Sequence, residues 1–120
     1  MTEQEIQSRI RVALSSSERI VFRTNAGEFW QGKRVFSQEF GQNVLINLRK
    51  IDGLPKGFSD LIVVDRQGIA FIETKTLSGV AKEHQQRFLS AMRSLGHRAG
   101  VARSVEEAMN IIEGNVSDDE

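Results

Sequence analysis

Two apolar runs near the middle of the chain constrain its fold most strongly. Residues 61–64 read Leu-Ile-Val-Val and residues 69–72 read Ile-Ala-Phe-Ile, with Asp-Arg-Gln-Gly between them. Runs of this length, rich in branched and aromatic residues and joined by a short polar turn, are typical of two buried strands that pair as a hairpin. We therefore expect this hairpin to form the centre of a sheet.

Further elements are expected on both sides of this hairpin. Thr2 and Glu5 have the spacing of a capping box, as do Ser104 and Glu107, and apolar residues recur at helical spacing after each pair. Gly96 is placed to end another helix. The patterns predict helices over about residues 3–15, 82–95 and 104–112, strands over 19–24 and 98–102, one or two hairpins over 28–51, and a loop over 52–57.

Length and composition fit one compact domain. The 120 residues are 39% apolar and 27% charged, which is close to ordinary globular usage and unlike a disordered chain. We expect a single domain over residues 1–114 and an acidic tail over residues 115–120. The order helix, strands, helix, strand, helix predicts an α/β sandwich with a mixed sheet.

Composition also excludes several classes of protein. No apolar stretch approaches the roughly 20 residues that cross a bilayer, and Met1 leads into a polar helix rather than a signal sequence. We therefore expect a cytoplasmic protein with no membrane partner. Because the chain has no cysteine and only two histidines, any metal site must be built mainly from oxygen ligands, which favour Mg²⁺ or Mn²⁺.

The net charge of zero hides a division along the chain. All 16 Lys and Arg residues lie at or before Arg103; with ten acids in the same segment, residues 1–104 carry a net charge of +6, whereas residues 105–120 carry six acids and no bases. A basic body can neutralise phosphates, although the same residues also keep a surface soluble. The acidic end is either a solvated terminus or a segment that shields the basic face from DNA.

Three charged residues flank the two buried strands. Glu73 and Lys75 are two apart, so their side chains project from one face of a strand, while Ile72 and Thr74 point to the other. Asp60 opens the partner strand, and the hairpin turn brings it beside them. Carboxylates that hold Mg²⁺ or Mn²⁺ and a cation that orients water suit phosphodiester hydrolysis. A surface ion pair is the simpler explanation, but charges at the ends of covered strands need a metal or partner to offset desolvation.

A wider set of motifs resembles one nuclease family. The chain is similar to the VRR-NUC branch of the PD-(D/E)XK nucleases at Gly57–Leu61, Ile72–Thr76, Gly79 and His84–Phe88. The turn at 23–25, the segment 101–104 and the first helix also fit this pattern. Ser59 stands where the superfamily name has proline. The resemblance implies a restriction-endonuclease-like core, in which a mixed central β-sheet is flanked by helices.

The resemblance also implies roles for individual residues. Asp60 and Glu73 would bind the metal, Lys75 would serve the attacking water, and Gln85 on the following helix would support the site. From the residues alone, an exposed position on a helix is the preferred interpretation of Gln85. These four residues are the catalytic candidates.

A glutamate of the first helix should complete the metal site, and two are available. At 100° per residue Glu3 falls within the arc of the apolar residues, whereas Glu5 lies far around the helix and already belongs to the capping box. We prefer Glu3, with a favourable charge at a helix N-terminus as the alternative for either residue. The candidate DNA contacts, some of which have purely structural alternatives, are Arg23, Asn25, Ser59 and Lys82.

The function implied by the resemblance is that of a Mg²⁺- or Mn²⁺-dependent DNA endonuclease. Stand-alone members of the family look like homodimers that act on branched DNA such as four-way junctions, where paired cuts need two sites related by symmetry. One alternative is a non-catalytic module that binds DNA structure. Another is an interaction protein that uses the aromatic hairpin region, although packing inside the core or the hairpin is the preferred interpretation of Phe29, Trp30 and Phe36.

Overall fold

The computed structural model describes residues 1–24 and 28–115. Asn25 and residues 116–120 of the acidic tail therefore lie outside the described part. No helix within that part combines the length and apolar character needed to span a membrane. The elements are α1 (Glu3–Leu14), β1 (Ile20–Arg23), β2 (Glu28–Ser37), β3 (Gln42–Asp52), β4 (Leu61–Asp65), β5 (Gly68–Thr74), α2 (Glu83–Ser94), β6 (Arg98–Ala102) and α3 (Val105–Ile112).

Four of the strands form the sheet of the body, in the order β1-β4-β5-β6. β4 runs antiparallel to both β1 and β5, whereas β6 runs parallel to β5. The predicted hairpin of residues 61–72 is confirmed as β4 and β5 at the centre of the sheet. The expected α/β fold with a mixed sheet is confirmed as well.

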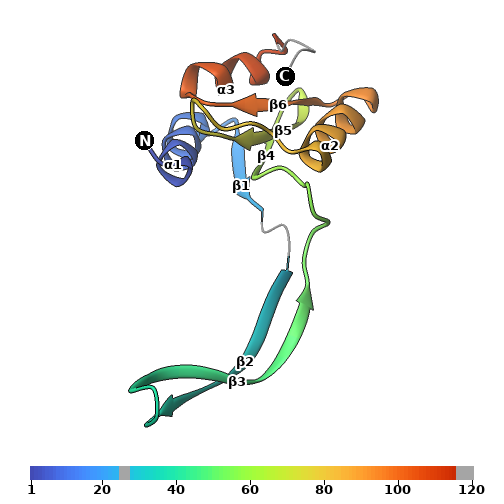
Figure 1. The fold of residues 1–120 in the computed structure, drawn as a ribbon. Coiled ribbons are helices and arrows are strands. Elements are labelled where there is room, and N and C mark those ends of the chain that lie inside the picture. Colours follow the sequence, from blue (N-terminus) through green and yellow to red (C-terminus); the bar gives the residue numbers. More distant parts are fainter. Residues whose placement is uncertain (25–27, 116–120) are drawn as a thin grey trace.

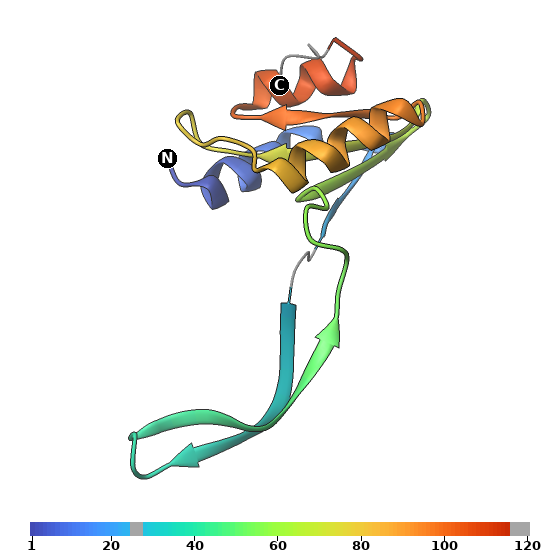
Figure 2. The same ribbon diagram turned by 45° about the vertical axis from the view of Figure 1, so that its right-hand side comes forward.

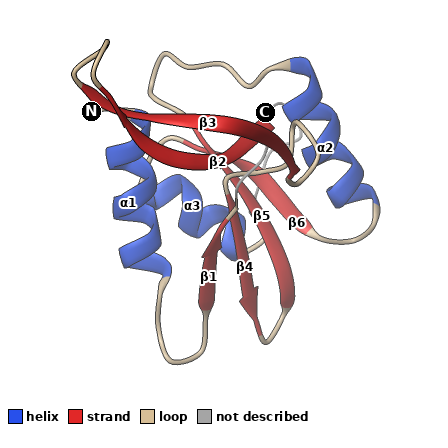
Figure 3. Cartoon of the chain, turned by 90° about the horizontal axis from the view of Figure 1, so that it is seen from below, coloured by secondary structure: helices blue, strands red, loops and turns tan. Residues whose placement is uncertain are grey.

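Helices cover the two faces of the sheet unequally. α1 and α3 lie on one side and α2 lies on the other (Figure 3). On the first side, Ile10, Leu61, Ile72 and Ile111 are fully buried in one cluster. On the second side, Phe71 packs in a smaller cluster that includes residues of α2. Because α2 contacts β5 and β6 but neither β1 nor β4 among the described elements, half of this second face has no helix over it.

β2 and β3 form a two-stranded ribbon, here called the arm, that leaves the body (Figure 1). Within the described residues the arm contacts no other helix or strand. Its projection raises the radius of gyration to 17.2 Å, above the roughly 14 Å typical of a compact chain of this length. Figure 2 shows that the arm is bent near its middle, where the register shifts and Asn47 has a φ of 54°, as a β-bulge produces.

The exposure of two aromatic residues on the arm contradicts a prediction made from the sequence. Trp30 and Phe36 are 54% and 64% exposed, so packing of these two residues in a core is wrong, although both do lie in a hairpin, that of β2 and β3. The reason is that the arm leaves the body before any helix or further strand can cover it. The residues alternate as strand residues should, and the pattern does not reveal whether a strand has a neighbour.

Candidate metal centre

Four strand ends meet at one edge of the body sheet and bring the predicted catalytic residues together. Leu61 pairs with Ile72, so Asp60, just before β4, comes beside Glu73 near the end of β5. The end of β1 is attached here, because Thr24 N donates to the carbonyl of Asp60 at 2.8 Å. The end of β6 is attached as well, because Lys75 N donates to the carbonyl of Ala102 at 3.1 Å.

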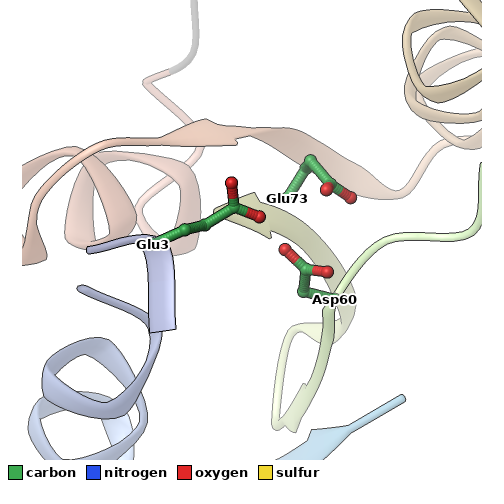
Figure 4. A group of neighbouring side chains, drawn as sticks. All are labelled: Glu3, Asp60 and Glu73. Atoms are coloured by element: carbon green, nitrogen blue, oxygen red, sulfur yellow. The ribbon is translucent and has the colours of Figure 1, made fainter. Parts of the chain in front are cut away.

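Three carboxylates converge at this edge. Glu3, Asp60 and Glu73 each offer one oxygen, and these three oxygens lie within 4.8 Å of one another. Figure 4 shows that the side chains come from the start of α1, the segment before β4 and the end of β5. Oxygens bound to one Mg²⁺ at about 2.0–2.1 Å are separated by at most about 4 Å, so small rotations of these side chains would let all three share a cation. A donor set made only of carboxylate oxygens is of the kind that suits Mg²⁺ or Mn²⁺.

The structure distinguishes between the two glutamates of the first helix. Glu3 belongs to the carboxylate group and Glu5 does not. Instead, the N–H of Glu5 donates to the Thr2 hydroxyl at 3.2 Å, as the capping box predicts. Glu3 is therefore the first-helix carboxylate that the fold brings to the site.

Asp60 is held in one orientation by the strand beside it. Its Oδ2 accepts hydrogen bonds from the Thr74 amide at 3.0 Å and from the Thr74 hydroxyl at 2.6 Å. The buried Gln7 of α1 donates in turn to that hydroxyl at 3.4 Å. Sequence reasoning assigned neither Thr74 nor Gln7 to the site. The polar Thr74 lies on the same strand face as the apolar Ile72, and this could have indicated a role for Thr74 in the site.

Glu73 is the most unusual group in the site. It is 2% exposed, and its Oε2 is the single buried side-chain polar atom without a hydrogen-bond partner among the described residues. Burial raises the pKa of Glu73 to about 8, and the nearby negative charge of Asp60 adds to this, while Lys75 acts in the opposite direction. Without a bound cation, the carboxyl is therefore largely protonated at neutral pH.

Gln85 orients Glu73 from the second helix. Its Nε2 donates to Glu73 Oε1 at 3.2 Å, while its Oε1 accepts from the Lys82 amide at 2.9 Å and so caps α2. The start of α2 also lies against the loop before β4, since a Cβ added to Gly57 would come within 2.7 Å of the carbonyl oxygen of His84. Gln85 is therefore a partly buried positioning residue and not an exposed one.

Lys75 supplies the positive charge of the site. Its Nζ lies 3.9 Å from Glu73 Oε1, and its side chain is 10% exposed. Glu73 also lies on the α2 side of the sheet, whereas Ile72 packs in the α1 and α3 cluster. The predicted alternation of side chains along this strand is thus confirmed.

The candidate DNA contacts lie in different environments. Arg23 at the end of β1 and Lys82 at the start of α2 are exposed. Ser59 is fully buried, and its hydroxyl donates to the carbonyl of Leu61 at 3.0 Å. Ser59 thus shapes the turn before β4 and has no surface to offer DNA. Asn25 falls outside the described residues.

Comparison with known proteins agrees with this geometry. A search of curated proteins finds no match. The family model of the VRR-NUC domain matches residues 1–106, a range that includes all three carboxylates, Lys75 and Gln85. A central mixed sheet flanked by helices is the restriction-endonuclease-like arrangement that the motifs implied. The chain therefore belongs to the VRR-NUC family of nuclease domains.

Proposed function

We propose that this nuclease domain is a Mg²⁺- or Mn²⁺-dependent DNA endonuclease. The observation that carries the proposal is the buried Glu73 carboxyl, whose Oε2 has no partner although Asp60 and Glu3 lie beside it. A buried carboxyl oxygen without a hydrogen-bond partner destabilises a fold. A divalent cation held by three carboxylates would offset that cost, so the arrangement is better explained by binding than by stability.

The residues divide into metal ligands and groups that act on water or on the ligands. Glu3, Asp60 and Glu73 would hold the cation, which when bound supplies charge that polarises the scissile phosphate. Lys75 is placed to orient the attacking water through its ammonium group. Gln85 fixes the orientation of Glu73 as Thr74 fixes that of Asp60, so both carboxylates are oriented before DNA arrives.

Exposed cations near this edge support DNA as the substrate. Arg23 lies opposite Leu61 in the sheet, one residue from Asp60, and Lys82 begins the helix that carries Gln85. Both are proposed phosphate contacts, as is Asn25 on the basis of the family resemblance. We also propose that the protein acts in the cytoplasm of a bacterial or phage-infected cell.

We further propose that the protein acts as a homodimer on branched DNA such as four-way junctions. The support is the family resemblance together with the requirement for two symmetry-related sites when two strands are cut as a pair. The mass in solution and the ratio of junction to linear-duplex cleavage test this part. A monomeric mass, or equal cleavage of both substrates, would contradict it.

The chemistry is tested by cleavage assays with matched variants. Linear duplex and four-way junction DNA are incubated with Mg²⁺, Mn²⁺ or EDTA. Lys75→Ala should reduce cleavage by roughly 10²-fold or more, whereas Lys56→Ala, an exposed lysine in the loop before β4, should not. Glu3→Gln should reduce cleavage and Glu5→Gln should not, although both remove a carboxylate from the first turn of α1.

Two outcomes would contradict a catalytic role. One is the absence of metal-dependent cleavage of either substrate, and the other is cleavage that Lys75→Ala leaves unchanged. Tight, salt-sensitive DNA binding without turnover would instead identify a DNA-structure-binding module of the same fold.

A further inference from the structure

The arm is attached to the body at the edge of the sheet that holds the candidate metal centre. Arg23 at the end of β1 is paired with Leu61 at the start of β4, and the arm lies between these two residues in the chain. Thr24 N donates to the carbonyl of Asp60 at 2.8 Å, so the segments before and after the arm meet beside a predicted metal ligand. The arm projects from this edge (Figure 1), and DNA held at the metal centre would lie at its base.

The arm is basic along most of its length. Residues 30–50 carry the four cations Lys33, Arg34, Arg49 and Lys50 against the single acid Glu39, and all four cations are exposed. Lys33 and Arg34 form no ion pair with any residue that the structure describes. The two remaining acids of the ribbon lie at its base, at positions 28 and 52. The surface of the arm therefore suits a polyanion.

Large apolar side chains lie among these cations. On β2, Trp30, Arg34 and Phe36 share one face, because they are an even number of residues apart. Leu45 joins this face as the partner of Arg34 in the register, and Lys50 joins it as the partner of Trp30. One face of the arm thus combines two cations with two exposed aromatic rings. In complexes with DNA, basic side chains contact phosphates, and apolar ones contact base edges in the grooves.

The dimensions of the arm match those of a duplex. β3 has 11 residues, which at roughly 3.3 Å each extend over about 35 Å along the strand. One turn of duplex DNA is about 34–36 Å long, and its major groove is wide enough to admit a two-stranded ribbon. A ribbon in a groove has phosphates on both sides, so Lys33 and Arg49, on the face opposite to Arg34, can bind them as well.

We propose that the arm is a second DNA-binding surface, which lies along the duplex for about one turn beside the cut. Lys33, Arg34 and Arg49 bind phosphates, while Trp30 and Phe36 contact the bases. This inference rests on the proposed DNA cleavage, and it adds the contact that sets the direction of the duplex across the metal centre. A protein partner would need acids opposite these cations, because a buried cation without a partner costs free energy. DNA supplies that negative charge along its whole length.

The first experiment uses Trp30, the single tryptophan of the chain, as a reporter of the arm. The full chain is titrated with a linear duplex of about three turns in EDTA, which prevents metal-dependent cleavage. The anisotropy of a dye on the DNA measures binding, and quenching of tryptophan fluorescence by acrylamide measures access to Trp30. Bound DNA should reduce this quenching, and salt that releases the DNA should restore it.

The second experiment compares two variants that each lose one exposed arginine. Arg34 lies on the arm, whereas Arg66 lies in the turn after β4, at the opposite end of that strand from Asp60. Arg34→Ala should weaken binding by roughly threefold or more and lower the slope of log affinity against log salt by about 1. Arg66→Ala should change neither quantity. Phe36→Ala should weaken binding without changing the slope, because it removes an apolar contact.

Folding of the variants and the role of catalysis are controlled separately. Circular dichroism melts show whether the body of each variant is folded, and the arm contacts no other described helix or strand that its substitutions could disturb. Lys75→Ala, which should lose cleavage, should still bind DNA and protect Trp30 from acrylamide.

Several results would overturn the inference. DNA binding that leaves the quenching of Trp30 unchanged would do so while leaving the proposed function intact, as would an Arg34→Ala protein with the affinity and salt slope of the wild type. Protection of Trp30 that grows with protein concentration, and that DNA does not alter, would assign the arm to a protein surface. Absence of any DNA binding would overturn the inference together with the proposed function.

Discussion

Replacing Glu73 by glutamine should stabilise the metal-free protein at alkaline pH while destroying its metal site. The carboxyl is 2% exposed and its Oε2 has no hydrogen-bond partner, so ionisation leaves a poorly solvated charge inside the fold. Glutamine has nearly the same shape, carries no charge, and can still accept the hydrogen bond that Gln85 donates. The substitution therefore isolates the cost of the buried charge.

The expected size follows from the pKa of Glu73. That pKa is about 8 in the folded protein, against the ordinary value of 4.5 for a glutamate carboxyl in water. The folded state holds the proton more tightly, so the stability contributed by this group is fully present below pH 4.5 and is lost as the pH rises to about 8. At about 1.4 kcal/mol for each pH unit, the loss is about 5 kcal/mol.

The assay is urea unfolding in EDTA at pH 4, 6, 8 and 9, with Glu5→Gln as the control for loss of an exposed carboxylate. The free energy of unfolding of Glu73→Gln should equal that of the wild type at pH 4 and exceed it by about 5 kcal/mol at pH 9. Added Mg²⁺ or Mn²⁺ at pH 8 should stabilise the wild type and leave the variant unchanged. Parallel pH profiles for the two proteins would refute the reasoning.

Three further predictions concern other parts of the molecule. Gln85→Ala should weaken metal affinity by roughly tenfold or more, because Glu73 loses its orienting partner; calorimetry with Mn²⁺ measures this, and an unchanged affinity would contradict the role. Arg98→Ala should destabilise the fold by about 3 kcal/mol, because Arg98 pairs with Asp65 at 2.7 Å and donates to the carbonyl of Ile112; denaturant unfolding tests it. Removal of residues 115–120 should increase DNA affinity if the acidic tail shields the basic body, and an unchanged affinity would dismiss shielding.

Much of the body could be predicted because its signals are local. Two apolar runs around a polar turn predicted β4 and β5, and the capping pairs Thr2–Glu5 and Ser104–Glu107 predicted the starts of α1 and α3. The two-residue period of a strand was enough to place Glu73 on the opposite face from Ile72. These features depend on residues close together in the sequence, whose geometry is set by backbone periodicity and local hydrogen bonds.

Long-range contacts decided the rest, because they depend on which elements meet in space. Helical periodicity favoured Glu3 over Glu5, but only packing of α1 on the sheet brought Glu3 to Asp60 and Glu73. Ser59 looked available to DNA, yet the turn before β4 buries it. Alternation predicted strands over residues 28–51 but not their separation from the body, since a period of two is the same whether or not a neighbour covers the strand. The sequence by itself thus determined the elements and the chemistry they carry, whereas the tertiary structure decided which side chains share a site and which apolar faces remain uncovered.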